Sequence, residues 1–165
     1  MNMKVYIAGK IGEEHPGPET LAKFKAAEDM LLKKGYEVFN PTTSGLGEVA
    51  DEAVLKAKAK GHETTWYAEI LKLDLEALSF CDAVYFMGDF YGSLGATAEY
   101  HFAMAIKKRC IFENRYYASD HLIKELINKI RNNEIELSPN YTFNEASKAY
   151  WEKHKVDCWW PLIDE

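Results

Sequence analysis

The sequence predicts a doubly wound α/β fold, in which helices cover both faces of a parallel sheet. Short runs of β-branched and aromatic residues alternate along the chain with longer segments whose apolar residues recur at helical spacing. Alternation of strand and helix is typical of a parallel sheet. The chain has 165 residues, a length that favours one domain with its own core.

The expected elements follow one another with short connections and no linker. In chain order they are a strand over 4–8, a helix between 18 and 35, a strand over 36–39, a helix over 48–60, a helix after Thr64 or Thr65, a strand over 83–87, a helix over 95–107, a strand over 110–112, a helix capped by Ser119 and a helix over 144–153.

Glycine, proline and hydroxyl residues define the ends of these elements. Pro18 suits the first turn of a helix, because that position leaves its N–H unbonded in any case. Gly35 suits the position just after a helix, and Asn40-Pro41 stops the second strand. Thr64 or Thr65 is a good N-cap for a helix that carries an apolar side. The pair Trp159-Trp160 is expected to cover the core, to pack in a subunit interface or to wall a base pocket, in that order.

Composition excludes several classes of function. Twenty Lys and Arg against 26 Asp and Glu give a net charge of −6, which predicts no binding to nucleic-acid polymers. No apolar run approaches the roughly 20 residues of a membrane span, and no signal peptide is expected. The three cysteines form no C-x-x-C pair and predict reduced thiols in a cytoplasmic protein. The histidines are scattered without ligand spacing, so neither a metal nor a cofactor is expected.

In a parallel sheet the ligand lies beyond the carboxyl ends of the strands. Three segments are predicted to meet there: Gly9-Lys10, Asn40-Pro41 and 88–99. Within the last, Gly92-Ser93-Leu94-Gly95 leads into a helix, where free backbone N–H groups can bind an anion. The same four residues can equally form a turn that merely starts the helix.

Two acidic residues are candidates for chemistry. Glu99 lies about one turn into its helix, where the helix dipole is expected to keep it ionised and available as a nucleophile. Taken alone, it is better interpreted as a carboxylate that stabilises the helix. Asp74 lies near an apolar stripe, and partial burial would raise its pKa and make it a proton donor; it can also lie at the edge of that stripe. Asp82 is expected to form a turn or cap hydrogen bond.

Three motifs together resemble the nucleoside 2-deoxyribosyltransferase superfamily. They are Y-I-A-G at 6–9, D-L-E-A-L-S-F-C-D at 74–82 and G-S-L-G-A-T-A-E at 92–99. The chain is particularly similar to phage and bacterial proteins that begin with Y-I-A-G and carry S-x-G-A-x-x-E. The resemblance covers residues 3 to about 113 of a single expected domain, 1–165, and leaves 114–165 as a helical extension. It implies a flavodoxin-like or Rossmann-like sheet and assembly as a homodimer or larger homo-oligomer.

By this resemblance Glu99 is the nucleophile that forms a glycosyl–enzyme ester. Asp74 is the acid that interacts with the sugar and the departing base, and Tyr6 hydrogen-bonds the nucleophile. Tyr6 can also be an ordinary buried strand residue. The transferases usually have Asp where this chain has Ser93, whereas the related deoxynucleoside 5′-monophosphate N-glycosidases have a serine that contacts the 5′-phosphate. Those hydrolases carry a further serine where this chain has Lys10, which can reach a phosphate by charge or lie solvated.

The expected function is cleavage of the N-glycosidic bond of a 2′-deoxyribonucleoside or its 5′-monophosphate. The catalytic candidates are Glu99, Asp74 and Tyr6. The substrate-binding candidates are Gly9, Lys10, Gly92, Ser93 and Gly95. Hydrolysis and transfer to a second base both stay open. The alternatives are a non-catalytic nucleotide-binding module or sensor, and a glycohydrolase of another nucleotide such as NAD.

Overall fold

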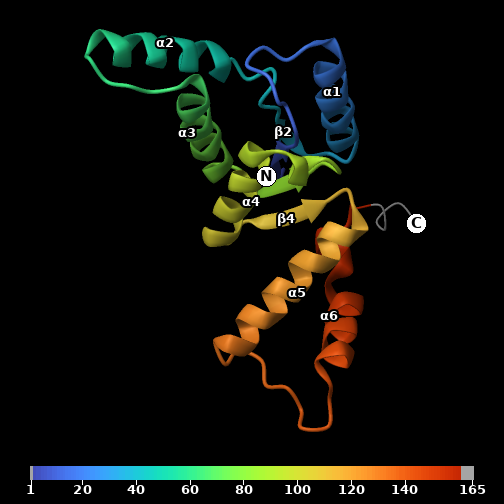
Figure 1. The fold of residues 1–165 in the computed structure, drawn as a ribbon. Coiled ribbons are helices and arrows are strands. Elements are labelled where there is room, and N and C mark those ends of the chain that lie inside the picture. Colours follow the sequence, from blue (N-terminus) through green and yellow to red (C-terminus); the bar gives the residue numbers. More distant parts are fainter. Residues whose placement is uncertain (1, 161–165) are drawn as a thin grey trace. The chain divides into compact units, whose positions relative to one another are not determined.

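The computed structural model describes residues 2–160 and has the α/β fold that the sequence predicts. Its four strands form one sheet in the order β2-β1-β3-β4. In chain order the elements are β1 (Lys4–Ala8), α1 (Pro18–Lys33), β2 (Glu37–Phe39), α2 (Leu46–Ala59), α3 (Trp66–Ser79), β3 (Ala83–Phe86), a short 3₁₀ helix (Phe90–Gly92), α4 (Leu94–Ala105), β4 (Arg109–Phe112), α5 (Arg115–Arg131) and α6 (Phe143–Cys158) (Figure 1).

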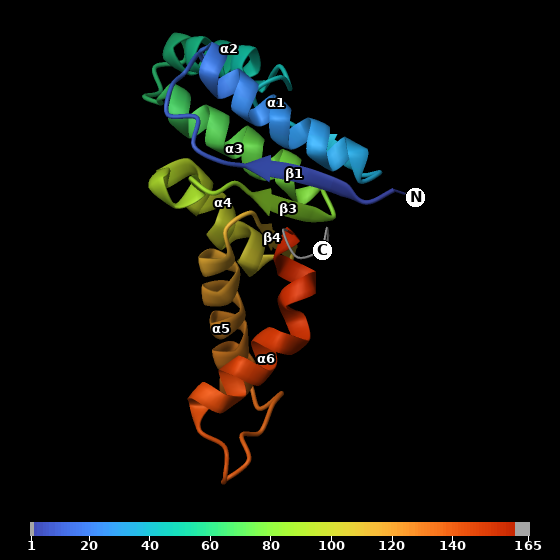
Figure 2. The same cartoon turned by 90° about the vertical axis from the view of Figure 1, so that its right-hand side faces the viewer.

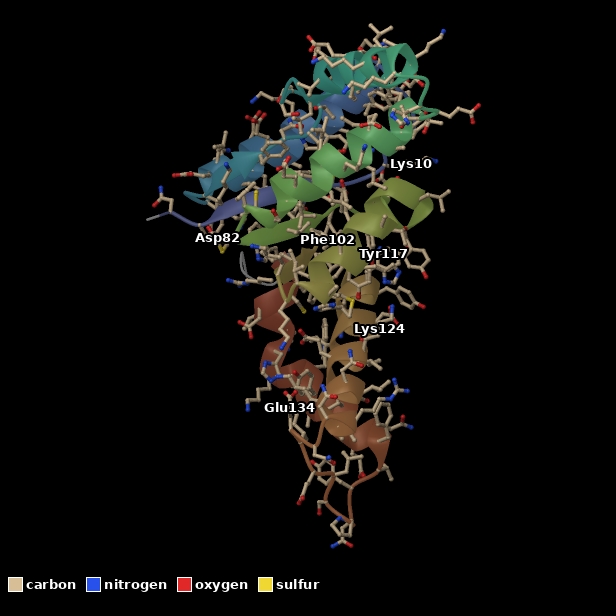
Figure 3. All side chains as sticks on the ribbon, turned by 90° about the vertical axis from the view of Figure 1, so that its left-hand side faces the viewer. Lys10, Asp82, Phe102, Tyr117, Lys124 and Glu134 are labelled. Atoms are coloured by element: carbon tan, nitrogen blue, oxygen red, sulfur yellow. The ribbon has the colours of Figure 1, made fainter. Side chains whose placement is uncertain are left out.

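The chain divides into two compact units between Cys110 and Ile111. In the first unit β1 is central and parallel to both neighbours: Val5 pairs with Val38 of β2 and with Ala83 of β3. The chain leaves β1 toward β2 and then returns past β1 to β3. Right-handed crossovers therefore place α1 and α3 on opposite faces of the sheet, as Figures 2 and 3 show from opposite sides. This reversal of direction lies between β1 and β3.

Most local signals in the first unit act as predicted. Pro18 is the first residue of α1, and Gly35 follows that helix with φ +85°. Thr65 caps α3, since its side chain accepts a hydrogen bond from the backbone N–H of Ala68. Several boundaries differ by one or two residues; for example, α4 ends at Ala105 and not at 107, and α2 begins at Leu46 and not at 48. The left-handed Gly45, with φ +80°, turns the chain directly into the helix.

The second unit contains the helices α5 and α6, which pack side by side (Figure 1). The prediction that Ser119 caps α5 is wrong. Asn114 is the cap, and its Oδ1 accepts a hydrogen bond from the Tyr116 N–H at 2.8 Å. An Asn side chain caps a helix as well as a serine does, so α5 begins almost directly after β4.

The C-terminal helix is longer than predicted. It starts after Thr142, which forms a capping box with Glu145, and it continues to Cys158. Beyond it, Trp159 forms a parallel bridge with Phe112, and Trp160 is 3% exposed, which agrees with a role in covering the core. The sequence also predicts burial for the rest of the apolar C-terminal segment, 161–163, which lies outside the described residues.

Gly9 ends β1 at a point where the backbone has no room for a side chain. A Cβ at Gly9 would lie 2.7 Å from Met87 Sδ and 3.2 Å from Phe24 Cζ, and both of these side chains are buried. We expect Gly9→Ala to lower the free energy of unfolding by about 1–3 kcal/mol, measured by urea denaturation. Gly47→Ala is the control, because a Cβ there meets nothing closer than 3.9 Å. Equal stability of the two variants would contradict this prediction.

Candidate active site

A cavity of about 510 Å³ opens in the first unit, beside the carboxyl ends of β1 and β3. Its walls come from the loop after β1, from the first turns of α3 and from the segment 92–99. The strand order reverses between β1 and β3, which is where open parallel sheets bind their ligands. The volume is typical of a site for a small molecule.

Glu99 lines this cavity and contacts Tyr6, which is not itself part of the wall. The Tyr6 hydroxyl donates a hydrogen bond to Glu99 Oε1 at 2.6 Å. Tyr6 is 0% exposed and Glu99 is 6% exposed, so the bond is shielded from water. The ring of Phe39 stacks on that of Tyr6, with centroids 5.4 Å apart. A tyrosine held in this way fixes the Glu99 carboxyl and favours its ionised form.

Asp74 brings a second carboxyl to the same cavity, from the third turn of α3. It is 8% exposed. Its Oδ1 is buried and has no hydrogen-bond partner among residues 2–160. Burial raises the pKa of Asp74 to about 7. Asp74 therefore meets the condition for a proton donor at neutral pH.

Glu99 also has a raised pKa, and this corrects the expectation that the helix dipole keeps it ionised at neutral pH. Burial and then the charge of Asp74 raise its pKa to about 8, although the hydrogen bond from Tyr6 lowers it. Because α4 begins at Leu94, Glu99 lies in the second turn, where the dipole has largely faded. Desolvation of the carboxylate is therefore the larger effect.

The two carboxyls titrate as a coupled pair. Between pH 7 and pH 8 the pair holds about one proton, since these are the pKa values of Asp74 and Glu99. The values are so close that a change of about 1.4 kcal/mol in either environment decides which carboxyl keeps the proton. Glu99 has the higher pKa, so it holds the larger share of this proton in the free protein. The hydrogen bond from Tyr6 lowers the pKa of Glu99 and so increases the share of the state in which Glu99 is ionised and Asp74 is protonated.

The predicted substrate-binding residues all line this cavity: Gly9, Lys10, Gly92, Ser93 and Gly95. Ser93 is the N-cap of α4, and its Oγ accepts a hydrogen bond from the Ala96 N–H at 3.3 Å. The Ser93 hydroxyl thus keeps its own hydrogen for a ligand. The methylene stem of Lys10 runs close to Gly92, with Cδ 4.0 Å from a Cβ built there. One side of the cavity therefore combines a cation, a hydroxyl donor and a helix N-terminus.

Lys23 and Asp89 join the two loops that form this side, and no sequence pattern predicted their role. Lys23 Nζ donates to the Lys10 carbonyl oxygen at 2.6 Å and to Asp89 Oδ2 at 2.5 Å. Asp89 Oδ1 in turn accepts from the Lys10 N–H at 3.1 Å. Both backbone polar groups of Lys10 are therefore fixed.

An aromatic and aliphatic wall from α3 was also missed. It consists of Trp66, Tyr67, Ile70 and Leu71. Trp66, Ile70 and Asp74 recur every four residues, so they share one face of the helix. This spacing was visible in the sequence and could have linked Trp66 to Asp74.

Two other candidates lie outside the cavity. Asp82 is at the opposite end of the sheet from Lys10 (Figure 3). Its Oδ2 accepts a hydrogen bond from the Lys4 N–H at 2.8 Å, which is a structural role, but this bond reaches the start of β1 and is not the local turn or cap bond predicted for it. Asn40 forms a turn in which its Oδ1 accepts from the Thr42 N–H at 3.0 Å. Pro41 lines a separate, smaller cavity.

Two searches of residues 2–160 gave negative findings. No group of three or more His, Cys, Asp and Glu side chains in that range is arranged to hold a metal ion. None of the helices in the same range is long and apolar enough to cross a membrane.

Comparison with protein-family models gave one match. The model described as "Domain of unknown function (DUF4406)" matches residues 3–112. This range contains every candidate site residue, from Tyr6 to Glu99. Searches of curated proteins and of solved structures found no match.

Proposed function

The chain belongs to the DUF4406 family, and we propose that its first unit cleaves the N-glycosidic bond of a 2′-deoxyribonucleoside or its 5′-monophosphate. One observation carries this proposal. Glu99, which accepts a buried hydrogen bond from Tyr6, lines the same cavity as the buried Asp74, whose Oδ1 has no hydrogen-bond partner among residues 2–160. Glycosidic cleavage needs one ionised and one protonated carboxyl on either side of the reacting bond, and this pair holds about one proton near neutral pH.

In the proposed mechanism, ionised Glu99 attacks the anomeric carbon while the bond to the base breaks. The electron pair of that bond leaves with the base, and Asp74 gives its proton to the departing nitrogen. Positive charge that develops on the anomeric carbon favours the ionised form of Glu99, as the Tyr6 hydroxyl also does. A missing 2′-hydroxyl makes this cationic transition state easier to reach. Water or a second base then breaks the glycosyl ester and returns a proton to Asp74.

The burial of two carboxyls argues against a module that only binds nucleotides. Each carboxylate loses hydration in the cavity, which raises both pKa values and opposes folding near neutral pH. A binding site for a nucleotide does not require this arrangement, whereas general acid catalysis and nucleophilic attack do.

The substrate class is tested by incubating the protein with deoxynucleosides, their 5′-monophosphates and NAD, each with and without a free acceptor base. The products are separated by chromatography. We expect release of the base from deoxynucleosides or from their monophosphates. Exchange of the base without net sugar release indicates a transferase, and free sugar indicates a hydrolase. A folded protein that releases or exchanges no base contradicts the proposal. Activity on NAD alone would make NAD, and not a deoxynucleoside or its monophosphate, the substrate.

The Ser93 side of the cavity is proposed to hold the 5′ end of the substrate. Ser93→Ala removes both the helix cap and a hydroxyl donor. We expect it to lower the stability by about 1 kcal/mol and to raise KM for the monophosphate by roughly tenfold, which corresponds to one lost hydrogen bond to a charged group. KM for the matching nucleoside should change little. An equal rise for both substrates would show that Ser93 does not contact a phosphate.

The activity should depend on pH as a bell-shaped curve. At pH values below about 7 both carboxyls are protonated, so the nucleophile is lost; above about 8 both are ionised, so the acid is lost. Tyr6→Phe removes the hydrogen bond that lowers the pKa of Glu99. The alkaline limb of the profile, which follows the higher pKa, should therefore move to higher pH, and the maximum of kcat/KM should fall about 10- to 100-fold.

Tyr85→Phe is the matched control for this measurement, because it removes a tyrosine hydroxyl from β3 at a position that does not line the cavity. The alkaline limb of its profile should stay where it is. A Tyr6→Phe variant with an unshifted profile would contradict the role of Tyr6.

We also propose that the protein works as a homodimer or larger homo-oligomer in the cytoplasm. Tyr67, Tyr91 and Leu94 are 55%, 57% and 93% exposed, and exposed apolar groups at the edge of a site often mark a contact between subunits. The three cysteines are buried and none forms a disulfide, which supports a reducing compartment. Light scattering coupled to size-exclusion chromatography measures the oligomeric state.

A further inference from the structure

A second cavity of about 270 Å³ adjoins the first within the same unit. The two cavities share five wall residues, which are Ile11, Glu13, Trp66, Ile70 and Asp74. Glu99, Ser93 and Lys10 line only the first cavity. The loop after β2 and the first turns of α2 line only the second.

The second cavity has a strongly acidic lining. Its carboxyls belong to Glu13, Glu14, Glu48, Asp51 and Asp74. Among the described residues no lysine or arginine lines it, and His15 is the only basic type of side chain there. Ionised carboxylates only accept hydrogen bonds, and several of them together produce a negative potential. Such a lining suits a ligand that presents N–H donors.

Asp74 lines both cavities, so it links the acidic lining of the second cavity to the chemistry in the first. Its side chain is more than nine-tenths buried, and its Oδ1 has no hydrogen-bond partner among residues 2–160. Glu99 reaches only the first cavity, so the sugar that it attacks lies there. The proton donor stands in the wall toward the second cavity, which is where the leaving group must be when it accepts that proton.

We infer that the second cavity receives the departing base, and that Glu48 and Asp51 select bases that carry an exocyclic amino group over bases with an oxo group at that position. This inference rests on the proposed function. An amino group donates N–H bonds to carboxylates, whereas an oxo group directs its lone pairs at them and is repelled. Both carboxylates are exposed to solvent, which screens their effect, and we therefore expect a discrimination of about tenfold and not more.

The test compares kcat/KM for deoxycytidine and deoxyuridine, which differ in a 4-amino or a 4-oxo group. The wild-type protein should prefer deoxycytidine. In Glu48→Gln/Asp51→Asn this preference should fall about tenfold, through a lower kcat/KM for deoxycytidine and a higher one for deoxyuridine, because an amide serves a donor and an acceptor equally. The change in the ratio isolates the two side chains, since the intrinsic reactivity of each substrate is the same in both proteins.

Glu52→Gln is the matched control. Glu52 lies on the same helix, pairs with Lys56 at 3.5 Å and lines neither cavity, so its loss should leave the preference unchanged. An equal preference in the wild type and the double variant, or a wild-type preference for deoxyuridine, overturns the inference and leaves the proposed function intact. Absence of base release from every substrate contradicts the proposed function itself.

Discussion

Glu99→Gln is expected to lower kcat/KM for base release by roughly 10³-fold or more, because the variant lacks the carboxylate that attacks the anomeric carbon. Glutamine has nearly the same shape as glutamate, and its amide oxygen can still accept the hydrogen bond from Tyr6. The substitution also removes a buried acid whose pKa is raised to about 8. The variant should therefore fold at least as well as the wild type, so a loss of activity is not a loss of structure.

A covalent intermediate distinguishes this role from simple binding. After an acid quench during turnover, intact-protein mass spectrometry should show a glycosyl adduct on the wild type, and peptide mapping should place it on Glu99. Glu99→Gln should show no adduct. Glu76→Gln is a suitable control, because Glu76 is an exposed residue of α3 and does not line the cavity. A Glu99→Gln variant that keeps its activity removes Glu99 from the mechanism.

The fold could be predicted because its signals are local. Strand residues are buried and β-branched or aromatic, and Pro18, Gly35 and Thr65 mark the ends of helices within a few residues. The start of α5 was misplaced because Ser119 and Asn114 are both good caps, and only the position of β4 favours Asn114.

The site could be predicted only in part. Tyr6 and Glu99 are 93 residues apart, so their contact depends on the fold and was expected only from a resemblance. The direction of the Glu99 pKa shift was wrong because burial is a property of the folded chain and the sequence shows only the helix start. The hydrogen bonds that Lys23 and Asp89 form with Lys10 join segments far apart in the chain, and no local sequence pattern predicts them. Trp66 is different, because the sequence itself shows that Trp66, Ile70 and Asp74 recur every four residues.

Asp74→Asn is expected to stabilise the protein at pH 8 while it removes most of the activity. The pKa of Asp74 is about 7 in the folded protein, against an ordinary value of 3.8. Between these two pH values the folded state binds more protons than the unfolded state, so the free energy of unfolding falls as the pH rises. The wild type should thus be less stable at pH 8 than at pH 5, with a contribution from Asp74 of about 2–3 kcal/mol to this difference.

Asparagine carries no charge, so Asp74→Asn avoids this loss of stability at high pH. Its gain over the wild type should be about 2–4 kcal/mol at pH 8 and much smaller at pH 5, measured by urea denaturation at both values. The difference between variant and wild type cancels the titration of the surface carboxylates, several of which have lowered pKa values and act in the opposite direction. If the gain is the same at pH 5 and pH 8, then the Asp74 carboxylate is well solvated and its pKa is not raised. Asp74 then cannot be the proton donor. A gain confined to high pH, together with lost base release, would show that this buried acid opposes folding and is retained for its chemistry.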